Sequence, residues 1–406
     1  MVASPAARPD AIRRHNLALV LGHIHLDGAL TRAELTQRLK VSRSTMGALV
    51  ADLIDLGLVA EVVPTGGSSV GRPSHVVGPH DGGPFVAAVD VDVTHVITAA
   101  VGIGGDILAR HVMTSGADVS SPETVADRVV SEVARVSKDT GRSHRPLAIG
   151  VSVPGTVDRF TGQVKVAPNL DWHDVAFGAM LAERLPESAR VVVGNDADLA
   201  VLAEHRRGAA RGFDDVVYLL GRVGVGAGII VNGIPLRGYD GHAGEIGHNV
   251  LDPSGPPCHC GKNGCTETFV GEGALLTMAG RELPPTDEVV AEVFAAARGG
   301  DSTALAAVRG IADPLGRAIG NLVNTLNPQR VLMGGTLSLV LDLARPEIQA
   351  SLEHNALDAP AQSVELIQPA FGADSPLIGA AEIAFATLLN DPLGASVERY
   401  SMAIRT

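Results

Sequence analysis

Residues 244–267 read GEIGHNVLDPSGPPCHCGKNGCTE, a glycine-rich segment that holds all three cysteines of the 406-residue chain. Together with the first histidine of the segment, they offer one imidazole nitrogen and three thiolates, a set that suits tetrahedral Zn²⁺ and leaves no open coordination position. An odd number of cysteines crowded into eight positions does not build a disulfide framework. A redox pair and unligated thiols are the alternatives. We expect a structural zinc site formed by His248, Cys258, Cys260 and Cys265.

The composition of the chain is that of a soluble globular protein, with 46% hydrophobic and 19% charged residues and no low-complexity block. Its length predicts two or three domains. No apolar run reaches the roughly 18 residues of a membrane span, and the first residues lack the apolar core of a secretory signal. We therefore expect a cytoplasmic protein that does not associate with a membrane.

Charge is distributed unevenly along the chain. The net charge of −13 by itself argues against nucleic-acid binding. Residues 1–80 nevertheless hold eight Lys and Arg against six Asp and Glu, whereas the remainder holds 24 against 39. A small basic module on an acidic body is a common arrangement in regulators, because only the module has to meet phosphates.

The first 80 residues contain two helix start signals separated by a short turn. Thr31 and Glu34 form a capping-box pattern, and Ser42 precedes apolar residues at helical spacing that end at Gly57. Two short helices joined in this way predict a helix-turn-helix. Because the segments after Gly57 predict a β-hairpin, we expect residues 1–80 to form a winged helix-turn-helix domain.

Two parts of this domain are expected to contact DNA. Arg43, Ser44 and Thr45 in the first turn of the second helix can reach phosphates and base edges in a major groove. Arg72, near the tip of the hairpin wing, can enter a minor groove. The alternative is a helical interaction module that touches no DNA, and these polar side chains argue against it.

From Phe85 onward the sequence contains two similar units, each with two apolar strands joined by a turn. The first reads FVAAVDVDVTHVITAAVGIGGDIL and is followed by a helical segment at 122–138; the second, DDVVYLLGRVGVGAGIIVNG, comes about 130 residues later. The repetition predicts two related α/β lobes that face a cleft. The glycines of the second unit do not form a dinucleotide loop, because a strand rather than a helix follows them.

Over essentially its whole length the chain resembles the ROK family, named for repressors, open reading frames and sugar kinases. Segment 244–267 is the most specific match. Further matches are the segments VPGTVD, APNLDW, GNDAD and NPQRVLMGGTLS. The resemblance implies an actin-like, ribonuclease-H-type α/β fold of two lobes and, with the N-terminal module, the regulator branch of the family. We expect residues 84–195 to form a small lobe, completed by a C-terminal helix at 380–406, and residues 196–379 to form a large lobe with the zinc site.

The resemblance also implies a sugar site in the cleft between the lobes. Carboxylates and amides form paired hydrogen bonds with vicinal hydroxyls, and the resemblance places six such contacts at Asn169, Asn195, Asp196, Glu245, His248 and Glu267. Since three of the six are carboxylates, we expect a neutral sugar. Each residue taken singly has another interpretation, as a helix cap, a turn residue or a group that orients the zinc loop.

Phosphate binding is expected to be lost. Asp196 matches the general base of the ROK kinases, here expected to be vestigial. The first hairpin turn reads Asp90-Val91-Asp92-Val93-Thr94, where the kinases have a glycine-rich DxGxT turn, and Arg222-Val223 replaces the first glycine and the threonine of their GTGxG turn. Because phosphoryl transfer depends on charge stabilisation around the phosphates, we expect no ATP and no catalytic residue. The alternative is that Arg222 compensates and a weak kinase persists.

Together these features predict a repressor of carbohydrate genes whose affinity for a double-stranded DNA operator is controlled by a sugar in a kinase-like cleft. A homodimer or homotetramer and a palindromic operator are expected. Two alternatives remain: an ATP-dependent sugar kinase that retains a DNA-binding module, and a regulator controlled by a protein partner.

Overall fold

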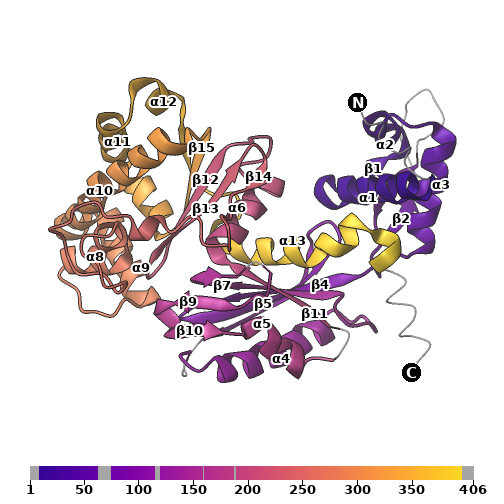
Figure 1. Cartoon of the computed structure of the whole chain (residues 1–406), viewed down its shortest axis with the longest axis horizontal. Helices are drawn as coiled ribbons and strands as arrows, with labels where there is room; N and C mark the ends of the chain where they lie inside the picture. Colours follow the sequence, from indigo (N-terminus) through magenta and orange to yellow (C-terminus); the bar gives the residue numbers. More distant parts are fainter. Residues whose placement is uncertain (1–8, 63–74, 115–118, 159, 187–188, 396–406) are drawn as a thin grey trace.

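The structure is a computed structural model that describes residues 9–62, 75–114, 119–158, 160–186 and 189–395. A small N-terminal domain lies beside two lobes, each built around a sheet (Figure 1). Within these residues no helix is both long and apolar enough to cross a bilayer.

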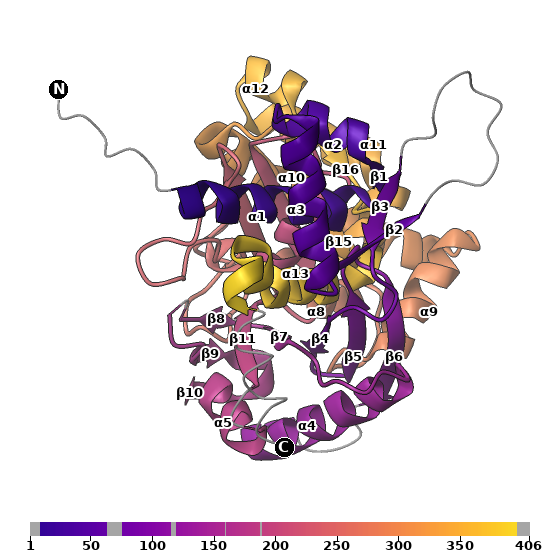
Figure 2. The same cartoon turned by 90° about the vertical axis from the view of Figure 1, so that its right-hand side faces the viewer.

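In its described residues, the N-terminal domain consists of three helices and a small antiparallel sheet (Figure 2). Its elements are α1 (Pro9–Asp27), β1 (Leu30–Thr31), α2 (Arg32–Leu39), α3 (Arg43–Asp55), β2 (Val59–Val62) and β3 (Val76–Pro79). Helix α2 starts with the capping box, in which the Thr31 hydroxyl accepts from the Glu34 backbone and the Glu34 side chain accepts from the Thr31 backbone. The Ser42 hydroxyl caps α3 in the same manner. Strands β2 and β3 pair as the two sides of the wing, whose tip lies outside the described residues.

In the described residues, each lobe contains a five-stranded sheet, and the two sheets have the same strand order. The first has the order β6-β5-β4-β7-β11 and the second β14-β13-β12-β15-β16. In both, three antiparallel strands are followed by two parallel ones. The strands are β4 (Phe85–Val91), β5 (His95–Gly102), β6 (Ile107–Thr114), β7 (Ala148–Val153), β11 (Arg190–Asn195), β12 (Val216–Gly221), β13 (Val225–Val231), β14 (Ile234–Pro235), β15 (Arg330–Gly335) and β16 (Glu365–Ile367).

The repeated apolar hairpins of the sequence are the central pairs of these sheets, β4–β5 and β12–β13. Strand β4 is buried along its whole length, as its continuous apolar pattern suggests. The first hairpin also continues into a third strand, β6, after a turn in which Gly104 and Gly105 both have positive φ. Strand β6 lies at the sheet edge, and its residues are exposed or half-buried, so its sequence lacks the continuous apolar pattern of β4 and β5.

Helices cover both faces of the first sheet (Figure 1). Helices α4 (Pro122–Asp139) and α5 (Phe177–Arg184) lie on the outer face, and α13 (Ser375–Asn390) packs on β4 and β7 on the other. The short strands β8 (Thr156–Val157), β9 (Val164–Ala167) and β10 (Trp172–Val175) form a side sheet near the cleft. The expected C-terminal helix at 380–406 thus begins earlier, at Ser375, and α13 ends at Asn390 because the next residue precedes a proline.

The second sheet packs against α6 (Asp196–Arg207) on one face and against α11 (Thr336–Asn355) on the other. Helix α10 (Ser302–Leu326) packs along α11 and closes the core of this lobe. The remaining helices of the lobe are α7 (Glu267–Val270), α8 (Glu272–Met278), α9 (Asp287–Arg298) and α12 (Asp358–Ser363). Helices α6 and α13 pack against each other between the two sheets, so α6 borders both lobes and the cleft.

Candidate functional site

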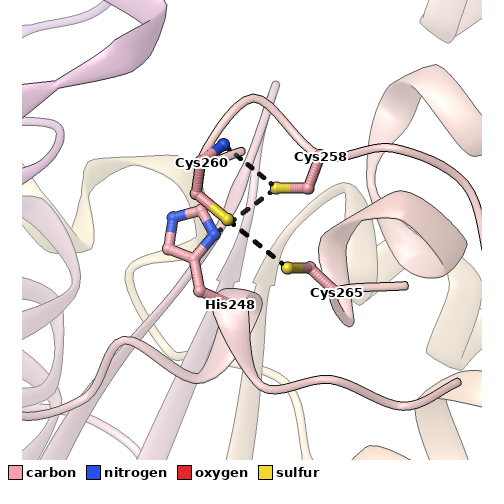
Figure 3. Close-up of side chains that lie close together, drawn as sticks. All are labelled: His248, Cys258, Cys260 and Cys265. Carbon is pink, nitrogen blue, oxygen red and sulfur yellow. Dashed lines mark hydrogen bonds between the residues drawn. The ribbon is translucent and has the colours of Figure 1, made fainter. Parts of the chain in front are cut away.

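The four expected metal ligands converge on one point, with all their ligand atoms within 4.8 Å of one another. Figure 3 shows the His248 ring and the three thiols pointing toward each other. The Sγ atom of Cys258 lies 3.6 Å from Nδ1 of His248, and the Sγ atoms of Cys260 and Cys265 are 3.6 Å apart. One imidazole nitrogen and three sulfurs at this spacing fit a tetrahedral metal ion.

The loop is shaped for this convergence by short-range backbone contacts. Isolated β-bridges join Pro257 to Asn263 and Val250 to Cys265, and they bring the two ends of the cysteine segment together. Gly264 has a φ of 69°, and a Cβ at this position would lie 1.5 Å from the Asp252 carbonyl oxygen. No other residue type fits there without moving the loop. The segment therefore folds back on itself closely enough for the three thiols to meet.

The surroundings of Cys258 disfavour the thiolate form of this residue when no cation is bound. Burial raises the pKa of the Cys258 thiol, and the neighbouring Glu267 carboxylate raises it further. The Cys258 thiol donates to Oε1 of Glu267 at 3.0 Å. Because metal binding releases thiol protons, a metal ion at this point would displace the Cys258 proton and free the Glu267 oxygen that now accepts it.

A cleft of about 750 Å³ opens between the two lobes beside this cluster. All six residues expected to contact a sugar line it: Asn169, Asn195, Asp196, Glu245, His248 and Glu267. They come from separate parts of the fold, namely a 3₁₀ turn at Pro168–Leu170, the end of β11, the start of α6, the 3₁₀ turn at Ile246–His248 and the start of α7. A volume of this size holds a small organic ligand. The structure thus gathers all six residues around one cleft.

Asn169 and Glu267, which come from different lobes, approach each other near Gly224 in the cleft wall. A Cβ built on Gly224 would lie 3.1 Å from Oε2 of Glu267 and 3.3 Å from Nδ2 of Asn169. The absence of a side chain at Gly224 therefore keeps room for both polar groups. Glycine at this turn is explained by that close approach, since its φ is not in the left-handed region.

The junction of β11 and α6 holds Asn195 and Asp196 in place. Oδ1 of Asn195 caps α6 by accepting from the Asp198 backbone N–H at 3.0 Å, and its Nδ2 donates to the Gly155 carbonyl at 2.8 Å. Oδ1 of Asp196 accepts from the Ala197 backbone N–H at 2.8 Å. The helix-cap interpretation that the sequence allows for Asp196 is wrong by one residue, because the cap of α6 is Asn195. The second oxygen of Asp196 has no partner among the described hydrogen bonds.

The environment of Asp196 disfavours its charge. Burial raises the pKa of Asp196 to about 7, with the Arg222 guanidinium opposing this rise and the nearby Asp90 carboxylate adding to it. Burial also raises the pKa of Asp198, one further cleft residue, to about 7. Asp198 belongs to the GNDAD segment but was not among the residues expected from the sequence; its place two residues after Asp196 in the first turn of α6 was the available signal.

Arg222 lines the cleft and bridges the two lobes. Its guanidinium lies 2.8 Å from Oδ2 of Asp90 and 3.2 Å from Oδ2 of Asp92, both on the first hairpin. Burial opposes the charge of Arg222, but these carboxylates raise its pKa, so it stays positive. The Ser152 hydroxyl donates to Oδ1 of Asp90 at 2.6 Å. The two hairpin turns are therefore joined directly to each other by an ion pair.

A second contact strengthens this connection between the lobes. The Thr94 hydroxyl, on the first hairpin turn, donates to Oδ2 of Asp287 at 2.9 Å, and Asp287 begins α9 of the second lobe. His95 lies 3.8 Å from the same carboxylate. These contacts join the first hairpin turn to the second lobe at a second place.

On the N-terminal domain, the first turn of α3 presents a polar surface. Arg43, Ser44 and Thr45 are exposed, while Met46 directly after them is buried. The Ser42 hydroxyl lies within hydrogen-bond distance of the hydroxyls of Ser44 (2.9 Å) and Thr45 (2.8 Å), so these groups form one small cluster at the helix start. Arg72, the expected wing contact, lies outside the described residues.

Comparison with known proteins supports the same architecture. Residues 86–387 match the model of the ROK family, and residues 18–67 match that of the MarR family. The xylose repressor of Bacillus subtilis strain 168 is 26% identical over 382 residues, which cover 92% of this chain and 95% of the repressor.

Two solved structures extend this likeness to three dimensions. A ROK family transcriptional regulator, a homologue of the E. coli MLC protein, has a TM-score of 0.77 at 25% identity and covers 95% of this chain and 99% of its own. A ROK family glucokinase from Streptomyces griseus, solved with glucose and AMPPNP, has a TM-score of 0.65 at 28% identity and covers 74% of this chain and 99% of its own. The fold predicted from the sequence, a winged helix-turn-helix followed by a two-lobed actin-like domain, is confirmed, and the chain belongs to the ROK family.

Proposed function

We propose that this protein is a cytoplasmic transcriptional regulator of carbohydrate metabolism, acting as a repressor whose affinity for an operator depends on a sugar in the interlobe cleft. The observation that carries this proposal is the joining, in one chain, of a winged helix-turn-helix and a cleft lined by six sugar-type contacts. The similarity to a xylose repressor, which extends over nearly the whole of both chains, supports this proposal.

The DNA contacts follow from the N-terminal domain. Arg43, Ser44 and Thr45 enter the major groove from the start of α3, where the exposed side chains and the positive end of the helix dipole both face outward. Arg72 on the wing contacts the adjacent minor groove. A homodimer or homotetramer would present two such domains to a palindromic operator.

The sugar contacts are amide and carboxylate groups from both lobes. Asn169 approaches from one side of the cleft and Glu267 from the other, so a sugar held between them favours the closed arrangement. His248 binds the metal through Nδ1 and offers Nε2 to a sugar hydroxyl. Two cationic side chains, Arg222 and Lys165, line the cleft in the described part of the chain. Arg222 is paired with Asp90 and Asp92, and Lys165 lies 3.2 Å from the Asp174 carboxylate, so neither favours an anionic ligand and the effector is a neutral sugar.

The metal in the cysteine cluster is a structural Zn²⁺. It supplies a rigid crosslink between loop segments and, with four protein ligands, leaves no open position for activating water. The sugar contacts come from the chain's own residues. The loop that the metal cluster fixes in position holds His248 and Glu267 at the cleft wall. We therefore assign the metal a role in shaping the sugar site and none in chemistry.

Kinase activity is the second candidate, since the family contains glucokinases. In this chain the two hairpin turns bind each other through Arg222, and Asp92 stands at the turn where phosphates would approach. Asp196, the matching base, is therefore vestigial, and the protein neither binds ATP nor transfers its phosphate. The test is an assay of sugar-dependent ATP turnover, with a ROK glucokinase as the positive control. Turnover by this protein would refute the proposal that it is not a kinase.

Fluorescence anisotropy on DNA from upstream of the protein's own and neighbouring genes tests the main proposal. Xylose, glucose, mannose and N-acetylglucosamine would be titrated at one fixed salt concentration, because phosphate contacts make affinity steeply dependent on salt. We expect one of them to shift the binding curve. Binding to DNA with no response to any sugar would instead favour regulation by a protein partner, and absence of DNA binding would contradict the regulator assignment.

A further inference from the structure

Helix α6 connects the sugar cleft to the N-terminal domain. It starts with Asp196 in the cleft wall and ends at Arg207, a span of 12 residues, or about 18 Å at 1.5 Å per residue. In Figure 1, α13 lies alongside α6 and continues to α1 of the N-terminal domain. One helix therefore has its first residue in the sugar site and its last residues near the DNA-binding domain.

The end of α6 is bound to three separate parts of the chain. The Arg207 guanidinium donates to Oε1 of Glu382 on α13 (2.5 Å), to the Gly104 carbonyl (2.7 Å) and to the His25 carbonyl on α1 (2.5 Å). Arg206 donates to the other oxygen of Glu382 at 3.0 Å. Arg207 alone thus joins α6, α13, the β5–β6 turn and the N-terminal domain.

The side chain of His25 completes this junction from the N-terminal domain. It is fully buried, and its Nδ1 accepts the Gly104 backbone N–H at 3.2 Å. Nε2 must therefore carry the proton, which it donates to Oε1 of Glu382 at 3.1 Å. Burial opposes ionisation of Glu382, but the hydrogen bond from His25 and the charge of Arg207 outweigh it and lower the pKa of this carboxyl. Glu382 thus stays negative and satisfied.

Such a network resists movement of one of its helices relative to the others. If α6 moved and α1 stayed, the Arg207 guanidinium and the His25 carbonyl would lose buried partners, and unsatisfied buried groups are costly. A cavity of about 260 Å³ lies against Arg207 and Glu382. The cavity leaves these side chains space to adjust while they keep their partners, so the helices can shift together.

Helix α6 is also held tightly along its length, so it moves as a unit with its neighbours. A Cβ on Gly228 of β13 would lie 2.1 Å from the Ala197 carbonyl oxygen, and one on Gly379 of α13 would lie 2.0 Å from that of Leu199. Backbone therefore rests directly on backbone on both sides of the helix. A displacement of α6 that begins at Asp196 would therefore move the large-lobe sheet and α13 with it.

We propose that Arg207, with Arg206, Glu382 and His25, forms the joint through which the state of the sugar cleft sets the orientation of the DNA-binding domain. These are positioning residues: they touch neither sugar nor DNA. The inference rests on the proposed function and adds to it the route by which the two sites communicate.

The test is a variant that breaks the joint and leaves both binding sites intact. Arg207→Gln removes the guanidinium, and Arg309→Gln is the matched control, because Arg309 makes one exposed ion pair with Glu347 on the far side of the large lobe. For each protein, DNA affinity is measured with and without saturating xylose, glucose, mannose or N-acetylglucosamine, and sugar affinity is measured with and without DNA. By thermodynamic linkage both comparisons give the same coupling factor.

We expect the wild type and Arg309→Gln to share a coupling factor within the usual range of about 5–150-fold, and Arg207→Gln to fall to within about twofold of no coupling. Sugar affinity of Arg207→Gln without DNA should stay within about threefold of wild type, which a general loss of structure would not allow.

Coupling that persists undiminished in Arg207→Gln would overturn the inference and leave sugar regulation standing. A wild type that binds DNA but responds to none of the sugars would instead refute the proposed function, and the joint with it. Should Arg207→Gln not fold, Arg207→Lys carries the same test. It keeps the charge, but a single ammonium cannot reproduce the planar fork that reaches three acceptors. Full coupling in that variant would equally overturn the inference.

Discussion

Replacing Arg222 by glutamine should destabilise the small lobe strongly. The change leaves the Asp90 carboxylate, which has no exposed surface, with only the Ser152 hydroxyl as a partner. Removing one partner of a buried ion pair typically costs about 3–5 kcal/mol. Asp92 is slightly exposed and can regain some solvation, so we expect the loss to come chiefly from Asp90 and to lie near 3 kcal/mol, the low end of that range.

The chain offers its own probe for this measurement. Trp172 is the single tryptophan, and it is buried in the small lobe with its indole N–H donated to the Val119 carbonyl. Urea unfolding followed by Trp172 fluorescence therefore reports on the lobe that contains Asp90. The double variant Asp90→Asn/Arg222→Gln is the control, because it removes the buried charge together with its partner and should recover most of the loss. A single variant destabilised by less than about 1 kcal/mol, the value of an exposed pair, would refute this reasoning.

Three further changes have defined outcomes. Burial raises the pKa of Asp196 to about 7, so the native state binds its proton more tightly than the unfolded chain does. That contribution is present at low pH and is lost as the pH rises through 7. Asp196→Asn should therefore be more stable than wild type at pH 8, by an amount on the order of 4 kcal/mol at most, with the difference shrinking toward pH 5 in paired urea titrations. Cys260→Ser should lower the bound zinc measured by elemental analysis and weaken sugar binding, whereas His259→Ala, a change at an exposed non-ligand between two cysteines, should keep about one zinc per chain. Arg43→Ala should weaken operator binding by about 1–3 kcal/mol, or flatten its salt dependence if the contact is to phosphate, while Arg309→Ala should do neither.

Each of these can be contradicted directly. If the stability of wild type and of Asp196→Asn changed in parallel with pH, the pKa of the Asp196 carboxyl would not be raised in the native state. Normal zinc content in Cys260→Ser would exclude that thiol as a ligand. Unchanged operator affinity and salt slope in Arg43→Ala would remove this residue from the DNA interface.

The elements that the sequence predicts well are those set by neighbouring residues. The capping box at Thr31 and the cap at Ser42 fix where α2 and α3 begin, because the side chains bond backbone groups within three residues. The continuous apolar run of β4 identifies a buried strand in the same local way. The three cysteines lie within eight positions, so the chain itself limits how far apart the thiols can be.

The features that the sequence does not reveal are contacts between distant charged residues. His25 and Glu382 are separated by 357 positions, and Arg222 and Asp90 by 132. No periodicity or spacing marks such pairs, since each residue alone is an ordinary polar residue that a solvated surface would also accept. Arg222 could be recognised only as a substitution in a glycine turn. Its partners, and the direct contact between the two turns, follow from how the lobes close on each other.

The central claim, that a sugar in the cleft controls DNA binding, is tested most directly by comparing wild type with Asp196→Ala. Operator binding is followed by anisotropy while the responsive sugar is titrated, and sugar binding is measured separately by calorimetry. We predict that Asp196→Ala binds operator with wild-type affinity, no longer binds the sugar and no longer responds to it. A variant that has lost sugar binding yet still changes its operator affinity when the sugar is added would contradict the claim.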